Sequence, residues 1–179
     1  KGTTIRRNAA SEPHVQQLCH MLNNMGANIQ HIGSNTLEIH GVEQLHGCEM
    51  TLDSDYLEVV SYIGAAVVTG GSIRVENAAP HHLRMARQVF ERLGVVWEVE
   101  GEDIIVPSDQ PLKVFPDLDG HFPKVDDGPW PAFPPDLMSV AITIATQVHG
   151  SVLFHEKMFE SRMFFVDKLV GMGARIILC

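Results

Sequence analysis

The sequence has no long apolar run and no leader-like start. Its longest apolar stretches, such as residues 63–68, are far too short to cross a bilayer. Residues 1–8 are charged and polar, without the apolar core of a signal peptide. With 45% hydrophobic residues and a mean hydropathy of +0.03, the composition is that of a globular protein. We therefore expect a cytoplasmic protein with no membrane partner.

Basic side chains are scarce. The sequence has 13 Lys and Arg against 22 Asp and Glu, for a net charge of −9. A nucleic-acid partner would require a basic stripe, so we expect none. No block of five like charges is present, which argues against a charged interaction tail. An anionic small substrate stays open, because a few local arginines can provide the required field.

Cysteines are few, odd in number and widely spaced: Cys19, Cys48 and Cys179. They form neither a disulfide framework nor a metal-binding spacing, and they fit a reducing compartment. We expect Cys19 and Cys48 to be buried, inert thiols. The ten histidines are scattered, and the adjacent pair His81 and His82 should point in two directions on a helix. We expect no metal site.

The strongest feature that is present is a repeated unit. Each copy begins with a glycine and a short alternating segment, continues with a helical pattern, and ends at a second glycine before an apolar segment. The copies begin at Gly2, Gly71 and Gly150, and their helical runs end at Gly26, Gly94 and Gly173. The closing glycines are 68 and 79 residues apart, which indicates a fold assembled from similar units.

Each unit predicts a strand, a helix and a second strand. Segments 72–76 and 151–155 alternate as strands do, and each closing glycine should end its helix in the left-handed conformation. A second strand should follow the closing glycine, as at 27–31 and 95–99. In the first two units a turn then leads to a third strand, at 36–40 and 104–106. The apolar helix positions are Val15, Leu18, Leu22 and Met25, then Leu83, Ala86, Phe90 and Leu93, then Phe165, Leu169 and Met172.

Two further helices, at 56–68 and 136–146, are apolar on nearly every side, which indicates that they are buried. The sequence therefore predicts an α+β fold of repeated βαβ-type units, with buried helices surrounded by small sheets. The chain begins without Met and stops directly after the apolar run 176–178. We expect it to be part of a longer protein.

Three motifs accompany the repeat. They are residues 8–14 (Asn-Ala-Ala-Ser-Glu-Pro-His), residues 131–136 (Pro-Ala-Phe-Pro-Pro-Asp) and residues 159–162 (Phe-Glu-Ser-Arg), the last followed by Met-Gly-Ala at 172–174. Together with the repeat they resemble the enolpyruvyl transferase family, and its UDP-N-acetylglucosamine branch rather than the shikimate-pathway branch. The resemblance covers nearly the whole chain. The exception is residues 115–129, which look longer and richer in Asp, Gly and Pro than the family's loop.

The resemblance implies six repeat units, three in each of two domains, in an inside-out α/β barrel-like fold that is truncated here. Residues 1–52 would be the last part of one domain, and 53–179 two repeat units of the other. The implied reaction transfers the enolpyruvyl group of phosphoenolpyruvate to the 3-hydroxyl of UDP-N-acetylglucosamine, for peptidoglycan synthesis. It needs no cofactor. Other active-site residues of the family lie outside these 179 residues, so the rest of the polypeptide would be needed to complete the cleft, and this fragment alone should be inactive.

Asp136 is the candidate catalytic residue. The attacking alcohol must lose a proton, and Asp136 follows two prolines at the start of an apolar helix. From its position alone, an ordinary helix N-cap is the preferred interpretation. The resemblance instead implies that Asp136 binds the sugar and acts as the base. Pro135 stands where the family usually has Thr.

The candidate substrate-binding residues are Asp136, Met158, Phe159 and Arg162. The resemblance implies that the Met158 backbone touches the nucleotide-sugar and that Arg162 faces the cleft near phosphoenolpyruvate. We expect a helix to begin near Phe159 and to carry Arg162 one turn in. The alternatives are a solvated Arg162, paired with Glu160 or Asp167, and a Phe159 that packs in the core, which is the better reading of its residue type.

Four other charged residues are interpreted as structural. Asp55 and Glu58 should be hinge or cap residues, and Glu12 and His14 should cap their helix. Two further classes of function stay open: a shikimate-type transferase, and a non-catalytic module that keeps the fold. The module would be favoured by Tyr56, which replaces an Arg of the family, by Pro135, and by the loop 119–134.

Overall fold

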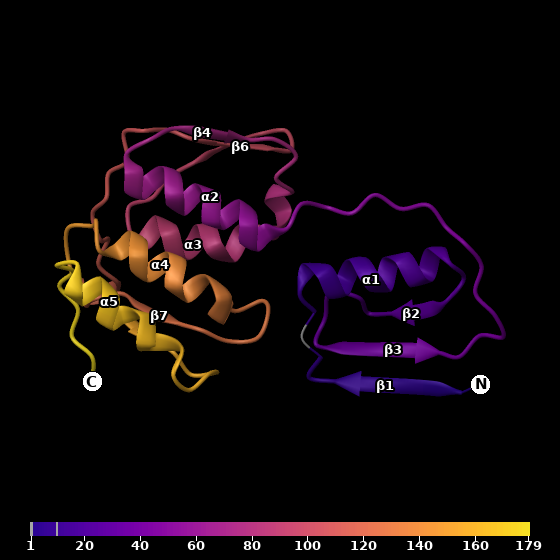
Figure 1. The fold of residues 1–179 in the computed structure, drawn as a ribbon. Helices are drawn as coiled ribbons and strands as arrows, with labels where there is room; N and C mark the ends of the chain where they lie inside the picture. Colours follow the sequence, from indigo (N-terminus) through magenta and orange to yellow (C-terminus); the bar gives the residue numbers. More distant parts are fainter. Residues whose placement is uncertain (1, 10) are drawn as a thin grey trace. The chain divides into compact units, whose positions relative to one another are not determined.

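A computed structural model of the chain describes residues 2–9 and 11–179. Lys1, and Ala10 of the first motif, lie outside the described residues. The chain divides into two compact units, Lys1–Asp53 and Ser54–Cys179 (Figure 1). Each is described by itself below.

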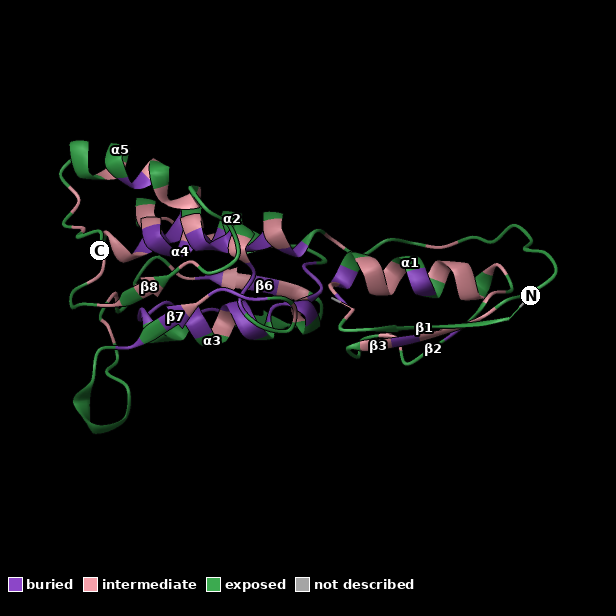
Figure 2. Cartoon of the chain, turned by 90° about the horizontal axis from the view of Figure 1, so that it is seen from below, coloured by how far each residue is buried: buried purple, intermediate pink, exposed green. Residues whose placement is uncertain are grey.

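The first unit is one helix on a small antiparallel sheet. It contains β1 (Thr3–Arg7), α1 (Pro13–Asn24), β2 (Asn28–Gln30) and β3 (Thr36–His40), and the sheet order is β1-β3-β2. Helix α1 lies along one face of the sheet (Figures 1 and 2). The buried core between them is small and consists of Cys19, Ile29 and Leu37.

Helix α1 differs in two details from its sequence pattern. Leu18, an expected inward position, is 51% exposed, and its neighbour Cys19 is buried in its place. A three-stranded sheet covers only a narrow stripe of a helix, so Leu18 lies beside the covered stripe. The expected side-chain cap is also wrong: Glu12 occupies the N-cap position without capping, and its carboxylate lies 3.5 Å from the His14 ring.

The second unit repeats the same order of elements. It begins with α2 (Tyr56–Thr69), β4 (Ile73–Val75), the 3-10 helix η1 (Pro80–His82), α3 (Arg84–Arg92), β5 (Glu98–Glu100) and β6 (Asp103–Val106). Its sheet order, β4-β6-β5, and its antiparallel pairing match those of β1-β3-β2. Strand β5 starts later than predicted, because both backbone polar groups of Val96 bond to the side-chain amide of Gln110 instead of a strand.

The rest of this unit departs from the repeat. It contains η2 (Leu118–Gly120), β7 (Lys124–Asp126), η3 (Pro135–Leu137), α4 (Met138–Ala145), β8 (Leu153–His155), η4 (Arg162–Phe165) and α5 (Val166–Gly171). Strand β8 pairs in parallel with β7, which the sequence did not predict. The strand expected after Gly173 is absent from the described residues 174–179.

The three closing glycines end their helices in the same way. Gly26, Gly94 and Gly173 have φ values of 98°, 75° and 100°. In each case the following amide bonds back across the last turn: Ala27 to the carbonyl of Leu22, Val95 to that of Phe90, and Ala174 to that of Leu169, at 2.9–3.0 Å. This is the Schellman arrangement, and it confirms the repeat that the sequence indicated.

Helices α2, α3 and α4 enclose the main core. All four predicted apolar positions of α3 and its end are buried (Leu83, Ala86, Phe90 and Leu93). Gly64 lets α2 approach α4 closely, since a Cβ there would lie 2.7 Å from Val140 Cγ1. Figure 2 shows the buried positions concentrated on these helices. Among the described residues, no helix combines the length and apolar character needed to cross a membrane.

Helix α5 is packed less deeply than predicted. Met172 is 77% exposed, and Val166 is the buried residue of the helix. The helix has only six residues, so a single inward side chain covers most of its contact with the core. The expected inward stripe of the third unit is therefore wrong at Met172.

Candidate functional site

Asp136 lies in the short 3-10 helix η3, just before α4. Pro134 is extended, with φ −69° and ψ 140°, and it occupies the N-cap position that the sequence pattern gave to Asp136. The Asp136 side chain makes no capping bond. Its Oδ1 instead accepts a hydrogen bond from Arg162 Nη2 at 2.8 Å. The N-cap interpretation of Asp136 is therefore wrong.

Arg162 is the first residue of η4 rather than a position inside a helix that begins near Phe159. Ser161, at φ 68°, turns the chain immediately before it. Besides its bond to Asp136, the guanidinium donates from Nη1 to the backbone carbonyl of Pro135 at 2.9 Å. Arg162 thus bonds to two groups of η3, the Pro135 carbonyl and the Asp136 carboxylate. It does not pair with Glu160 or Asp167, the partners expected for a solvated arginine.

Phe159 lies against the same guanidinium. Its ring centroid is 5.0 Å from Arg162 Cζ, a distance at which the cation is attracted to the ring face. The ring is 49% exposed, so the expectation of a core position is wrong. Residues 157–161 have no regular structure and run along the surface, which leaves one face of the ring outside the core.

Met158 is 41% exposed beside this cluster. Its backbone amide is occupied by two carboxylate oxygens, Asp127 Oδ2 and Glu156 Oε1, both at 3.2 Å. A ligand that touched the Met158 backbone would therefore meet its carbonyl oxygen. The sequence-based candidates Asp136, Phe159 and Arg162 are in direct contact, and Met158 adjoins Phe159 along the chain.

Two acidic residues that the sequence interpretation missed support this segment. Asp127 is only 4% exposed, and its Oδ1 accepts the amide of Lys157 at 2.6 Å. Glu156 Oε1 accepts the amides of Met158 and Phe159 at 3.2 Å each. Burial first, and then hydrogen bonding with Asp127, raise the pKa of Glu156 above its ordinary value. Asp127 lies in the stretch 115–129, where an Asp-Asp-Gly string is typical of an exposed turn.

The neighbouring carboxylate of Asp126 is in contact with two lysines and a histidine. It lies 3.0 Å from Lys124 Nζ, 3.2 Å from Lys157 Nζ and 3.1 Å from His155 Nδ1. Burial acts to raise the pKa of Asp126, but the hydrogen bonds from Lys124 and Lys157 outweigh it and hold that pKa below its usual value. The two lysines and the histidine are thus paired at the rim of the site.

Comparison with known proteins decides the family. The model of the family described as EPSP synthase (3-phosphoshikimate 1-carboxyvinyltransferase) matches residues 1–177. The chain belongs to the EPSP synthase family.

Similar relatives carry a more specific name within this family. UDP-N-acetylglucosamine 1-carboxyvinyltransferase of Treponema denticola is 57% identical over 179 residues, covering 100% of this chain and 42% of the relative. The enzymes of that name from Bradyrhizobium diazoefficiens (57%, covering 99% and 41%) and Bacteroides thetaiotaomicron (51%, covering 100% and 41%) are also similar. The chain thus spans about two fifths of the length of these relatives. The resemblance to the UDP-N-acetylglucosamine branch is confirmed.

Two solved structures support the fold. The enolpyruvyl transferase NikO from Streptomyces tendae superposes with a TM-score of 0.82 at 24% identity, covering 99% of this chain and 41% of that protein. EPSP synthase from Acinetobacter baumannii superposes with a TM-score of 0.60 at 18% identity, covering 97% and 40%. The expected α+β fold, with buried helices and small sheets, is confirmed.

The structure also tests the sequence-based interpretation of two acidic residues and two cysteines. Asp55 caps α2, since its carboxylate accepts the amide of Leu57 at 2.8 Å, and Glu58 follows in the first turn. Cys19 is buried as expected, and burial raises the pKa of its thiol. Cys48 is exposed, contrary to expectation, because residues 41–53 run over the surface without regular structure.

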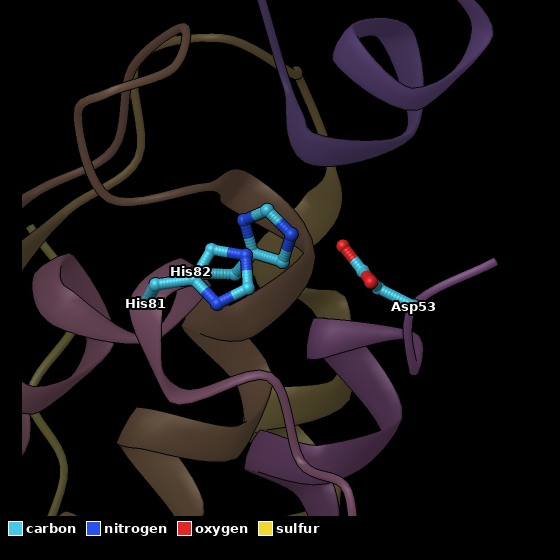
Figure 3. Close-up of side chains that lie close together, drawn as sticks. All are labelled: Asp53, His81 and His82. Carbon is cyan, nitrogen blue, oxygen red and sulfur yellow. The ribbon is translucent and has the colours of Figure 1, made fainter. Parts of the chain in front are cut away.

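The adjacent histidines do not diverge as expected for a helix. His81 and His82 lie in the 3-10 helix η1, and their ring centroids are 3.9 Å apart at an interplanar angle of 48° (Figure 3). His82 is buried, whereas His81 is exposed.

Proposed function

We propose that the protein containing this chain transfers the enolpyruvyl group of phosphoenolpyruvate to the 3-hydroxyl of UDP-N-acetylglucosamine, with release of phosphate, in peptidoglycan (cell wall) synthesis. The observation that carries the proposal is the contact of Asp136 with Arg162, formed where two short helices begin, in a chain more than half identical to enzymes of that name. A cytoplasmic location is part of the proposal, because both substrates are phosphorylated metabolites of that compartment.

The proposed domain assignment follows the repeat. Residues 1–52 form the last part of one domain, and residues 53–179 form two repeat units of the other. The matching strand orders β1-β3-β2 and β4-β6-β5 support this assignment. The remaining repeat units, and the residues that complete the substrate cleft, belong to the rest of the polypeptide.

Asp136 is proposed as the residue that accepts the proton of the sugar 3-hydroxyl. As the hydroxyl oxygen forms its bond to C2 of phosphoenolpyruvate, its proton passes to the carboxylate, and a separate acid protonates C3. Arg162 binds Oδ1 of Asp136, while Oδ2 takes part in no hydrogen bond among the described residues. The Asp136 side chain is 56% exposed, so Oδ2 can be reached by a substrate hydroxyl.

Arg162 is proposed to face the anionic groups of phosphoenolpyruvate. Its two terminal nitrogens are fixed on Pro135 and Asp136, so its positive charge is oriented before the substrate binds. Lysine could not reproduce this fork of donors. The exposed ring of Phe159 and the carbonyl of Met158 are proposed to line the nucleotide-sugar side.

The test uses the full-length protein that contains this chain. Phosphate release from phosphoenolpyruvate should depend on UDP-N-acetylglucosamine and not on 3-phosphoshikimate. Asp136→Asn should lower kcat by about 10²-fold or more, the usual range for loss of a general base, with a smaller effect on KM. Glu160→Gln, at an exposed neighbouring carboxylate, is the matched control and should leave kcat nearly unchanged.

Each alternative predicts a different result. Turnover of 3-phosphoshikimate would indicate the shikimate-type transferase, and no turnover of either acceptor would indicate the non-catalytic module. An Asp136→Asn protein with full kcat would refute the assigned base. The isolated 179 residues should be inactive and should bind UDP-N-acetylglucosamine weakly or not at all by calorimetry; sub-micromolar affinity would contradict the view that the cleft is incomplete.

A further inference from the structure

Asp127 connects the two segments that carry the candidate site. Its backbone pairs with Phe133 in an isolated parallel bridge, three residues before Asp136. Its carboxylate accepts the amides of Lys157 and Met158, at 2.6 and 3.2 Å. A buried carboxylate with both oxygens on backbone amides is a rigid anchor. Asp127 therefore links the motif 131–136 to the segment that leads to Arg162.

Glu156 binds the same segment, residues 157–159, at the two amides farther along the chain. Its Oε1 accepts the amides of Met158 and Phe159 at 3.2 Å each. Its Oε2 is buried and has no hydrogen-bond partner among the described residues. An unpartnered carboxylate oxygen in such a position is costly, whereas a hydroxyl there can donate to a neighbouring acceptor.

The Asp127 carboxylate lies beside that of Glu156, because both accept the amide of Met158, at 3.2 Å each. Two carboxylates so close in a partly buried place cannot both ionise without a large cost. Burial first, and then hydrogen bonding with Asp127, raise the pKa of Glu156 accordingly. One proton held between them removes the repulsion and gives Oε2 a partner at the same time.

Nearby cations do not offer another way to neutralise the pair. The charged groups on the elements around it are Lys124 and Asp126 on β7, His155 on β8, Lys157 and Glu160 on the segment itself, and Asp136 and Arg162 on η3 and η4. Arg92 of α3 also reaches β7, where its Nη1 donates to the backbone carbonyl of Lys124 at 3.0 Å. Lys124, Lys157 and His155 are paired with Asp126, and Arg162 is paired with Asp136. A proton on one of the two carboxyl groups is therefore the remaining way to neutralise the pair.

We propose that Asp127 and Glu156 share one proton, and that this carboxyl pair positions residues 157–159, and through Phe159 the Arg162 guanidinium, for the transfer reaction. Both are positioning residues, since neither touches the reacting groups. The role in the reaction rests on the proposed function above, whereas the shared proton does not.

The test compares Glu156→Gln with Glu156→Ala in the full-length protein. Glutamine keeps a neutral group that donates to Asp127 and accepts the two backbone amides, so kcat should stay within about threefold of the wild type. Alanine removes both, and kcat should fall by about 10²-fold, the size of effect that a misplacement of about 1 Å produces. Glu160→Gln, the same substitution at an exposed neighbour, controls for loss of one charge.

The pH profile separates positioning from general stability. The wild-type kcat should decline as pH rises through the raised pKa of Glu156, because the Glu156 carboxylate then forms and repels that of Asp127. Glu156→Gln should lack this decline. A Glu156→Gln protein as inactive as Glu156→Ala, or a Glu156→Ala protein with wild-type kcat, would overturn the positioning role.

A readout independent of turnover keeps the two proposals distinguishable. A carboxyl whose pKa is raised in the folded state binds more protons folded than unfolded, so its contribution to stability falls as pH rises between the two values. The denaturant midpoint of the wild type should therefore drop relative to that of Glu156→Gln as pH rises above the ordinary Glu pKa. If the denaturant midpoints of the wild type and of Glu156→Gln changed with pH in the same way, the shared proton would be refuted, whichever substrate the protein uses.

Discussion

Gly94 is the position where the repeat should tolerate substitution least. It ends α3 at φ 75°, a conformation that costs an L-residue about 1–2 kcal/mol. A Cβ at Gly94 would also lie 2.6 Å from the backbone nitrogen of Lys113 and 2.7 Å from its carbonyl oxygen. These are backbone atoms, so no side-chain rotation relieves the overlap. Gly94→Ala must therefore move the α3 end away from residues 112–113.

The matched control is Gly101→Ala. Gly101 has φ 63° in the β5–β6 turn, and a Cβ there would meet nothing within 4 Å. Gly101→Ala should destabilise the protein by about 1 kcal/mol. The cost of the left-handed conformation is partly offset by about 0.4–1 kcal/mol, because alanine makes the unfolded chain less flexible. Gly94→Ala adds overpacking of about 1–3 kcal/mol, for a total of about 2–4 kcal/mol.

Chemical denaturation of the full-length protein, followed by circular dichroism, measures both variants. The expected result is a lower midpoint for Gly94→Ala than for Gly101→Ala, with unchanged slope. Equal midpoints would refute the close approach of Lys113 and leave only the backbone conformation as the reason for glycine at this place.

Three further predictions follow from burial and capping. Phe90→Ala should destabilise the protein by about 3–5 kcal/mol in the same assay, since the Phe90 side chain is completely buried. Asp55→Ala should cost about 1 kcal/mol through loss of the α2 cap, and Asp55→Asn should recover most of it. Iodoacetamide should label Cys48 of the native protein rapidly and Cys19 slowly, as read by peptide mass spectrometry, because Cys19 is buried and its thiol pKa is raised; equal rates would contradict this.

The repeat was predictable because its signals are local. A glycine that ends a helix, an apolar stripe at helical spacing and an alternating strand each act within a few residues, so Gly26, Gly94 and Gly173 gave the helix ends correctly. The inward faces were less predictable. Leu18 and Met172 satisfy the helical spacing yet are exposed, because the face that is covered depends on the width of the neighbouring element.

The candidate site was predictable only in part. Asp136 and Arg162 were selected through motifs, and nothing in a separation of 26 residues indicates that their side chains meet. Phe159 was expected in the core because of its residue type, whereas its place is set by Arg162. Asp127 left no usable signal, since an acidic residue beside a glycine is far more often exposed than buried.

The parallel pairing of β7 with β8 accounts for both the missed residues and the departure from the repeat. In the first two units a hairpin supplies the central strand and one outer strand, the other outer strand comes from the start of the same unit, and all pairing among the described residues is antiparallel. In the third, the register sets Asp126 opposite His155, so the next residues along the two strands, Asp127 and Glu156, leave the sheet together. Parallel strands run in the same direction, so both carboxyl groups emerge at one end of the pair, beside the chain that leads to Arg162. A hairpin at this position would have directed the two residues to opposite ends. The change of topology in the third unit is therefore what brings two acidic side chains together under the candidate site.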